Sequence, residues 1–451
     1  MTDRPAYAAD TIVAAATPPG TGGIAVVRIS GPGVRRIAAA VLGGVPPPRL
    51  ASLKTFRDAA GQPLDEGIAL FFPAPASYTG EDVLELQGHG GRWVVAGIVD
   101  AVTALGARRA RPGEFSQRAF LNDRLDLVQA EAIADLVEAG SAQAARAALS
   151  SLTGAFSAAV HSLQEALTTL RLHVEAAIDF PEDEVDFLTD EALALRMRAC
   201  EGAFEDLRRR AAAGKLLRDG YRVVIVGPPN AGKSSLLNAL SGEDSAIVTE
   251  LAGTTRDILR EIIDLDGLAV ELIDTAGLRD DPDRIEAEGI RRAREALARA
   301  DAVLWMEDAA APDPRAPAEP LPEDIPVVRV RNKIDLTGET PGVVAAGDPA
   351  AVSVSARTGA GLDALRQLLR DLAGGRDTGE GAFTARQRHL DALAAAGEHF
   401  RAAKAALEEA RAGELTAEEL KLAQHALAEI TGGITSDELL GRIFGEFCIG
   451  K

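Results

Sequence analysis

The chain has 451 residues, and 48 Lys and Arg against 68 Asp and Glu give it a formal net charge of −20 at pH 7. This acidic surplus excludes a protein that coats nucleic acid over its whole surface, but it leaves room for a local basic patch. With 47% hydrophobic residues, two distant cysteines and no apolar run of about 18 residues, we expect a cytoplasmic globular protein of about three domains, without a secretion signal, transmembrane helix, disulfide scaffold or zinc cage.

The first third of the chain predicts an α+β domain. Strand-like runs lie at 24–30, 67–72 and 83–91, and a helix is expected at 92–106. From about residue 126 the sequence turns Ala-rich with helical spacing, and one apolar stripe comprises Leu163, Leu167, Leu170, Val174 and Ile178. A further helix is expected at about 190–213.

A different pattern then interrupts the helical one. Residues 220–242 read as strand, glycine loop and helix, and further short apolar strands are expected at 269–277, 301–308, 325–335 and 350–359. Such alternation of strand and helix predicts a parallel sheet. The helical pattern resumes near residue 383 and runs to the end of the chain.

We therefore predict a multidomain chain in which an α/β P-loop domain is inserted into an all-α domain. The expected boundaries are 1–122 for the α+β N-terminal domain, 123–215 and 377–451 for the two parts of the helical domain, and 216–376 for the inserted α/β domain. The two helical blocks should pack together, because each alone has an apolar face to bury.

The segment GPPNAGKS, residues 227–234, matches the P-loop pattern and stands between an apolar strand and a helix. Its backbone N–H groups are expected to bind phosphate oxygens, Lys233 to reach the outer phosphates, and the Ser234 hydroxyl to bind Mg²⁺. The predicted phosphate-contacting residues are Asn230, Ala231, Gly232, Lys233, Ser234 and Ser235.

Two later motifs predict the base. NKID, residues 332–335, supplies Asn332, Lys333 and Asp335. An ionised Asp335 only accepts hydrogen bonds, and guanine offers two adjacent donors where adenine has an acceptor, so the site should take GTP rather than ATP. A shorter and weaker motif, SAR, lies where another guanine-contacting loop is expected and comprises Ser355, Ala356 and Arg357.

Two further motifs predict the Mg²⁺ and γ-phosphate side of the site. DTAG places Asp274 where a Mg²⁺-binding aspartate belongs and Gly277 where an amide can contact the γ-phosphate, while GTTRD at 253–257 offers Thr255 to Mg²⁺. The residue after DTAG is Leu278, which cannot position a water molecule as a glutamine would. Glu286 and Glu288 are candidates for that task, although both could belong to a solvated helix face.

Taken together, these motifs resemble the MnmE (TrmE) family of tRNA-modifying GTPases. The resemblance extends over the whole chain and includes ATPPGTGGIAVVRISG and YTGEDVLELQGHGG near the N-terminus, RPGEFSQRAFLND at 111–123, the split helical domain, and the closing FCIGK. The P-loop is common to many families, whereas RPGEF and FCIGK are specific to this one.

The resemblance implies a function and partners. The family acts with the FAD- and NADH-dependent flavoprotein MnmG, as a heterotetramer built on a homodimer, and installs an aminomethyl or carboxymethylaminomethyl group at position 5 of the tRNA wobble uridine. A 5-formyl- or methylene-tetrahydrofolate is the implied one-carbon cofactor.

The resemblance also assigns residues in the GTPase domain. The family's GTPase domains dimerise around K⁺, which implies Asn230 as a K⁺ ligand together with Thr249, Leu251 and Thr254, and it places Thr249, Thr254 and Thr255 among the GTP contacts. The water-orienting glutamate of the family falls on Glu286.

The implied folate site lies in the N-terminal domain, at a dimer interface. Its positions fall on Arg28, Glu85, Arg124 and the terminal Lys451, with Arg124 replacing the family's usual lysine. The apolar tail should fold back so that Lys451 approaches this site. Cys448 beside it is open to two interpretations, a packed thiol or a nucleophile.

Two other functions remain open at the level of sequence. The GTPase motifs equally suit a switch that assists ribosome or RNA assembly and modifies nothing. A direct folate-dependent aminomethyl transferase with a merely regulatory GTPase domain is the third possibility. Folate binding by the N-terminal domain separates the first function from the second, and modification without a flavin partner would indicate the third.

Overall fold

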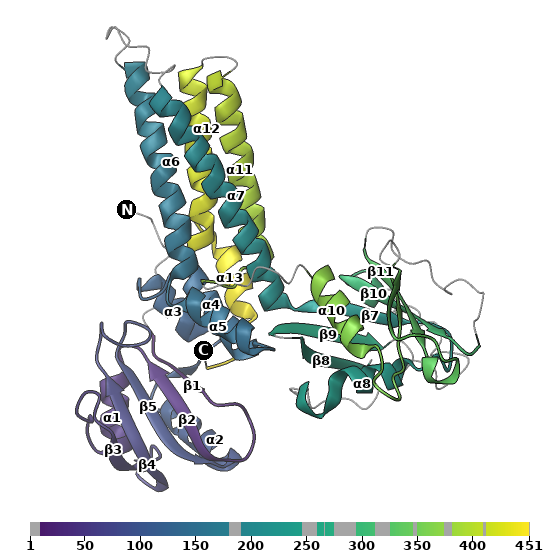
Figure 1. Ribbon diagram of the computed structural model, residues 1–451. Helices are drawn as coiled ribbons and strands as arrows, with labels where there is room; N and C mark the ends of the chain where they lie inside the picture. The colour runs from purple at the N-terminus through teal and green to yellow at the C-terminus, as the bar shows by residue number, and fades with distance from the viewer. Residues whose placement is uncertain are drawn as a thin grey trace. The chain divides into compact units, whose positions relative to one another are not determined.

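A computed structural model gives the fold (Figure 1). The structure describes residues 10–179, 191–245, 259–265, 267–274, 295–311, 325–345, 350–373, 381–408 and 412–450. The chain divides into two compact units, of which the first is Met1–Ala134, Ser151–Leu207 and Asp391–Lys451 and the second is Asp135–Ser150 and Arg208–Leu390.

The first unit contains a six-stranded sheet in the order β3-β4-β5-β2-β1-β6. Its strands are β1 Ile12–Ala15, β2 Gly22–Ser30, β3 Ser52–Arg57, β4 Pro63–Phe72, β5 Val83–Gly90 and β6 Arg108–Arg109. All neighbours are antiparallel except β1 and β6, which are parallel. The three predicted strands are confirmed, whereas β1, β3 and β6 were not predicted because they are short or carry charged residues on an exposed face.

Each face of this sheet has its own cover. Helices α1 (Val34–Leu42) and α2 (Arg92–Ala104) pack on the face that carries Val27 of β2 and Leu86 of β5. Phe115, from α3 (Glu114–Leu121), packs with Ile12 and Ala14 on the other face. Because side chains alternate along a strand, the residues that flank Val27 and Leu86 in sequence point toward the Phe115 face.

The helices of the first unit form a bundle in which segments distant in sequence lie side by side (Figure 1). The helices here are α4 Leu127–Glu138, α5 Ala142–Leu152, α6 Ala155–Asp179, α7 Glu191–Asp219, α11 Gln387–Glu408, α12 Gly413–Thr431 and α13 Asp437–Gly445. Of these, α5 up to Ser150, α4 from Asp135 and α7 from Arg208 belong to the second unit. Gln424 of α12 donates a hydrogen bond to Thr168 of α6 at 2.5 Å, and the rings of Phe204 in α7 and Phe400 in α11 lie 5.2 Å apart. The two helical blocks thus pack together, as predicted. In the described ranges, no helix is both long and apolar enough to cross a membrane.

The C-terminal tail of the first unit folds back onto the chain. Phe444 and Phe447 are buried in a cluster with Phe120 of α3 and residues of α4. A Cβ added to Gly113 would lie 2.5 Å from the carbonyl oxygen of Phe444, so the RPGEF turn accepts only glycine at this contact. The predicted docking of the apolar tail is therefore confirmed for residues up to 450.

The second unit contains a seven-stranded sheet in the order β12-β13-β11-β10-β7-β9-β8. Its strands are β7 Tyr221–Val226, β8 Leu259–Leu265, β9 Leu268–Asp274, β10 Ala302–Asp308, β11 Val327–Asn332, β12 Gly342–Ala345 and β13 Ala350–Ser353, and its helices include α8 Lys233–Ser245 and α10 Leu362–Leu372. The five inner strands are parallel and buried.

The predicted parallel sheet is confirmed for the five inner strands, but the strand at each edge is antiparallel. β8 runs antiparallel to β9, and β12 runs antiparallel to β13. Neither edge strand was predicted, because LREIIDL alternates charged with apolar residues and GVVA is very short. Edge strands need only one apolar face, which weakens their pattern in the sequence.

Candidate functional site

The described residues of the four nucleotide motifs, which for DTAG means Asp274 alone, lie at one edge of the seven-stranded sheet. The register pairs Ile225 of β7 with Asp274 of β9, and Val226 with Trp305 of β10. Asp308, which ends β10, pairs with Asn332, which ends β11. This is the carboxyl edge of a parallel sheet, where ligands of open α/β folds bind.

The P-loop follows β7 in a conformation that its glycines permit. Gly227 has φ +152° and Gly232 has φ +92°. An added Cβ would lie 2.5 Å from the Met306 carbonyl oxygen at Gly227 and 2.3 Å from the Asn332 side-chain nitrogen at Gly232. Asn230 also adopts a left-handed conformation, with φ +64°. The loop is thus pressed against the neighbouring strands by backbone rather than by side chains.

Lys233 is the first residue of α8 and is only 7% exposed. Its ammonium group donates to the carbonyl oxygens of Gly227 and Pro228, each at 2.9 Å. The lysine is therefore held across its own loop, at the positive end of the α8 dipole, where a phosphate would be attracted. Ser234, the predicted Mg²⁺ ligand, is the next residue of α8 and is exposed.

Asn332 links the P-loop to the SAR loop. This residue is 2% exposed, its side-chain nitrogen donates to the Ala231 carbonyl at 2.9 Å, and its side-chain oxygen accepts from the Ala356 amide at 3.0 Å. Because its donor and its acceptor bond backbone groups of two different loops, this side chain links the loops to each other. The structure thereby brings the first and last predicted motifs together.

Asp335 carries the base-selecting chemistry. Its Oδ1 accepts a hydrogen bond from the buried Ser355 hydroxyl at 2.7 Å. The nearest Arg357 nitrogen lies 3.9 Å from the Asp335 Oδ2, and the Arg357 side chain is 83% exposed, so that pair contributes little. Ser355 fixes the orientation of the carboxylate and leaves Oδ2 to accept from a guanine edge.

Asp308 is a site residue that the sequence reasoning missed. Lys333, in a left-handed conformation with φ +69°, makes an ion pair with the Asp308 carboxylate at 2.6 Å. The hydrogen bond from Lys333 lowers the pKa of Asp308. This pair fixes the lysine that precedes the base-selecting segment. The signal was available, since an acidic residue ending a buried strand at a carboxyl edge is a candidate ligand or anchor.

Several predicted residues lie outside the described part of the chain. They are Thr249, Leu251, Thr254, Thr255, Gly277, Leu278, Glu286, Glu288 and Lys451. The backbone of Asp274 is described at the end of β9, but its side chain is not. Among the described residues, no group of three or more His, Cys, Asp and Glu side chains is arranged to hold a metal ion.

A second polar group lies on the Phe115 face of the six-stranded sheet. Arg28 and Glu85 are cross-strand partners in β2 and β5, and the Arg28 Nε lies 2.9 Å from the Glu85 Oε1. The guanidinium stands over the rings of Tyr78, at 5.1 Å, and Phe115, at 5.8 Å. Its Nη1 also donates to the Gly450 carbonyl at 3.4 Å, so the C-terminal tail reaches this group.

Aromatic side chains surround this pair and partly bury it. The Tyr78 hydroxyl lies 2.7 Å from the Ser116 hydroxyl, and burial raises the pKa of Tyr78. Arg28 and Glu85 keep 22% and 17% of their side-chain surface exposed. A partly open carboxylate and guanidinium over aromatic rings can bind a planar ligand that has both donors and a charged end.

The remaining predicted residues of this group are less well placed. Arg124 is exposed and lines a shallow hollow with Asp126 and Gln129. Cys448 is exposed, which contradicts the interpretation of Cys448 as a thiol packed in the interior. The tail packs through Phe444 and Phe447 instead. Cys200, by contrast, is buried, and burial raises the pKa of its thiol.

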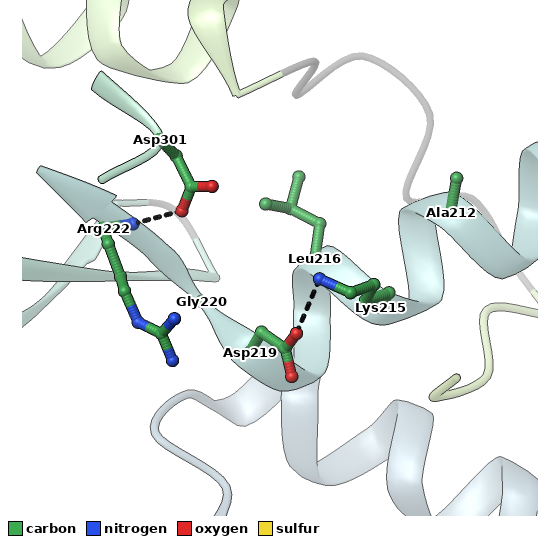
Figure 2. A pocket seen from close by; sticks show the side chains of 7 residues that line it. All are labelled: Ala212, Lys215, Leu216, Asp219, Gly220, Arg222 and Asp301. Atoms are coloured by element: carbon green, nitrogen blue, oxygen red, sulfur yellow. Dashed lines mark hydrogen bonds and ion pairs between the residues drawn. The ribbon is translucent and has the colours of Figure 1, made fainter. Parts of the chain in front are cut away.

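A further hollow, shown in Figure 2, lies at the opposite edge of the nucleotide sheet. Its walls come from the last turns of α7, from Arg222 at the start of β7, and from Asp301 just before β10. The Arg222 amide donates to Asp301 at 2.8 Å, and Lys215 pairs with Asp219 at 2.8 Å. Because β7 begins here and the P-loop follows its other end, this hollow is not the nucleotide site.

Comparison with known proteins gives the family. Residues 11–124 match the model for the GTP-binding protein TrmE N-terminus, and residues 127–448 match the model for the MnmE helical domain. The chain is 59% identical over 443 residues to the tRNA modification GTPase MnmE of Alkalilimnicola ehrlichii, covering 98% of this chain and 99% of that protein.

Solved structures were also compared. The G domain of the T. maritima FeoB iron transporter is 24% identical, covers 34% of this chain and 98% of its own, and has a TM-score of 0.24. The elongation factor SelB of Methanococcus maripaludis is 20% identical, covers 35% of this chain and 34% of its own, and has a TM-score of 0.22. The two family matches and the near full-length relative decide the assignment: the chain belongs to the MnmE (TrmE) family of GTPases.

Proposed function

We propose that this protein hydrolyses GTP as part of tRNA modification at position 5 of the wobble uridine. The observation that carries the GTP assignment is the Asp335 carboxylate, which Ser355 orients so that one oxygen stays available to the guanine edge. Family membership over nearly the whole chain supports the tRNA part of the proposal.

The nucleotide chemistry follows from the described residues. Lys233 would exchange its two carbonyl partners for phosphate oxygens, and the backbone N–H groups at the start of α8 would donate hydrogen bonds to the same phosphates. Asn332 holds the P-loop and the SAR loop at a fixed separation, so phosphate and base contacts form together. Mg²⁺, which Ser234 would bind, supplies charge neutralisation of the phosphates.

We also propose K⁺ as an activating ion. Asn230, in its left-handed conformation within the P-loop, is the described residue assigned to it. A monovalent cation there would stabilise the negative charge that develops during phosphoryl transfer, as an arginine finger does. GTP turnover should then be faster in K⁺ than in Na⁺ at equal ionic strength, and equal rates in the two salts would remove this part of the proposal.

The Arg28 and Glu85 pair supports a folate site in the N-terminal sheet. A pterin has adjacent donors that suit Glu85, and the glutamate tail of a folate suits cations such as Arg28 and Lys451. The ion pair satisfies both residues when no ligand is bound. Binding of 5-formyl-tetrahydrofolate, measured by calorimetry, should be lost on Arg28→Ala.

The remaining parts of the proposal concern assembly. We propose a homodimer that works with an FAD- and NADH-dependent flavoprotein of the MnmG type, which family membership over nearly the whole chain supports. With a net charge of −20, tRNA contact should be local or should be carried by the partner.

The deciding experiment is mass spectrometry of tRNA nucleosides from cells with and without the gene. Loss of 5-aminomethyl-type wobble uridines, restored by the wild-type gene but not by an Arg28→Ala copy, is the expected result. An unchanged profile would reject the proposal and favour an RNA-assembly switch. Modification in a reconstituted reaction without any flavoprotein would instead favour direct transfer from folate.

A further inference from the structure

The β8–β9 hairpin connects the two parts of the chain that are expected to contact the outer phosphate and Mg²⁺. β8 begins at Leu259, just after the GTTRD motif in sequence, and β9 ends at Asp274, the first residue of DTAG. The strands pair in continuous register from Leu259 with Asp274 to Leu265 with Leu268. A paired ribbon of this kind moves as one body, so its far turn and its nucleotide end are mechanically linked.

The far turn of this hairpin is held by the loop between α4 and α5. The Ser141 hydroxyl, in a residue that is 2% exposed, donates a hydrogen bond to the Gly267 carbonyl at 2.6 Å. A Cβ added to Gly140 would lie 3.4 Å from the Ala269 Cβ and 3.6 Å from the Ile262 Cγ2. The loop therefore touches both strands of the hairpin near the turn.

Gly267 shows how close this approach is. It has φ +98°, and an added Cβ would lie 2.1 Å from the Gln143 Cδ. Its amide also donates to the Asp264 side chain, which closes the turn from within. The turn favours glycine because its backbone conformation is left-handed, and the Gln143 side chain lies directly against it.

The helix that precedes this loop, α4, is itself fixed by two arginines that flank the α/β domain in sequence. Asp135, near the end of α4, is 7% exposed and accepts from Arg218 at 2.9 Å and from Arg386 at 2.7 Å. Arg218 lies two residues before the corner at Gly220 where α7 turns into β7, shown in Figure 2, and Arg386 lies where the chain leaves the α/β domain. A Cβ on Gly220 would lie 2.9 Å from the Ala269 carbonyl oxygen, so this corner also contacts β9.

We propose that Ser141 and Gln143 are positioning residues for GTP hydrolysis. They fix the far end of the β8–β9 hairpin, and through it they set where Leu259 and Asp274 stand relative to the phosphates. The same contact would transmit a nucleotide-dependent movement of the hairpin to the α4–α5 loop, which lies within the residues that match the MnmE helical domain. This inference rests on the proposed GTPase activity and adds a control point to it.

The contact between Ser141 and Gly267 could also be purely structural, and an experiment can distinguish this role from the positioning role. The Ser141 hydroxyl also accepts from the Ala144 amide at 3.1 Å, so it caps α5. β8 is an edge strand that a covering loop would protect in any case. A variant that keeps the cap and loses only the hydrogen bond to Gly267 distinguishes positioning from covering.

The matched pair is Ser141→Asn and Ser141→Asp in the full-length protein. Both side chains accept from the Ala144 amide, and they are nearly equal in size, but only asparagine can donate to the Gly267 carbonyl. We expect Ser141→Asp to lower kcat for GTP roughly fivefold while GTP affinity stays within about twofold. Ser141→Asn should retain most of the wild-type kcat, and Arg146→Ala, on the exposed side of α5, should match the wild type.

The second readout is hydrogen–deuterium exchange of residues 139–152 with GDP and with a non-hydrolysable GTP analogue. The wild type and Ser141→Asn should show a nucleotide-dependent difference in this segment, which Ser141→Asp should lack. Equal kcat in the Asp and wild-type proteins, or equal losses in Asp and Asn with a lowered Tm, would overturn the proposal. If the wild type hydrolyses no GTP at all, it is the proposed function that fails.

Gln143→Ala tests the same proposal if Ser141→Asp does not fold because its carboxylate is buried. It removes the side chain that packs on Gly267 without burying a charge, so the protein should fold with an unchanged Tm. The nucleotide-dependent exchange difference in residues 139–152 should shrink, and kcat should fall in the same direction as in Ser141→Asp. An undiminished exchange difference in Gln143→Ala would overturn the proposal.

Discussion

Lys233 and Asp335, which would face the nucleotide, differ from Arg28 in how far along the chain their bonded partners lie, whereas the bridge from Asn332 to Ala231 spans 101 residues. Lys233 bonds carbonyls five and six residues before it, and Asp335 is oriented by Ser355, twenty residues on. Arg28, in contrast, meets Glu85 at a separation of 57 residues and Gly450 at 422. A phosphate loop is a local chain conformation, whereas the second group exists only after the sheet and the tail have assembled.

This difference explains what could be predicted from the sequence. The P-loop, DTAG, NKID and SAR motifs identified the nucleotide site directly, because glycines and an N-terminal helix turn encode the geometry in adjacent residues. The Arg28 pair was assigned only through the family resemblance. Asp308 was missed for the same physical reason, since its role depends on a partner from a neighbouring strand.

The fold shows the same division. Buried inner strands and amphipathic helices were predicted because one continuous pattern marks them. The edge strands β8 and β12 were not predicted. β8 is half of the hairpin that joins the GTTRD motif to the DTAG motif. The exposure of Cys448 could not be predicted either, because it depends on Phe444 and Phe447 filling the tail's docking site in its place.

The largest expected effect tests the local site. Asp335→Asn replaces an acceptor-only carboxylate with a side chain that can donate, so affinity for GTP should fall about 100-fold or more. Xanthosine triphosphate, whose base has a carbonyl in place of the exocyclic amine, should recover much of the affinity. Titration with both nucleotides measures the exchange, and unchanged GTP affinity would reject the assignment of Asp335 to the base.

The buried ion network around Glu114 offers a test of the assembled region. Glu114 accepts from Arg108 and Arg118, and Arg118 is 1% exposed and also bonds Asp10 and Glu81. Glu114→Gln should destabilise the N-terminal sheet by about 3 kcal/mol at pH 7, because it leaves the buried Arg118 and the half-buried Arg108 short of a charge. Amide hydrogen exchange of β1 and α3 peptides reports this loss locally, and the P-loop peptides serve as the internal control.

The same network sets a pH dependence. Burial alone would raise the pKa of Glu114, but hydrogen bonds from Arg108, the Arg111 amide and Arg118 bring it down to about 2 from 4.5. A depressed carboxyl pKa stabilises the folded state above the unfolded value and loses that contribution as the pH falls toward the folded value. The stability difference between wild type and Glu114→Gln should therefore be constant near pH 7 and shrink between pH 4.5 and about 2. A difference that grows on acidification would contradict the paired network.

The role of Glu286 in orienting the attacking water was assigned by family resemblance alone, and a substitution tests it. Glu286→Ala should bind GTP as the wild type does but hydrolyse it roughly tenfold or more slowly, because a water molecule loses its orienting carboxylate. Glu288→Ala is the matched control, two residues along the same acidic segment, and should keep the wild-type rate. Single-turnover hydrolysis separates binding from chemistry, and a reversal of the two variants would move the role to Glu288.

The smallest effect is expected at the C-terminal tail, where variants can change the Arg28 site without changing the nucleotide site. Cys448 is exposed and its carbonyl, not its thiol, accepts from the Gly113 amide at 3.4 Å. Cys448→Ser preserves the backbone contact and the phenylalanine packing, so GTP hydrolysis should be unchanged and tRNA modification should stay substantial. Gly113→Ala is the informative counterpart, because an added Cβ would collide with the Phe444 carbonyl and the Phe447 Cβ and displace the tail from Arg28. If Cys448→Ser abolishes modification while folding and GTP turnover persist, the thiol takes part in the chemistry and the tail acts through its sulfur rather than through its docking.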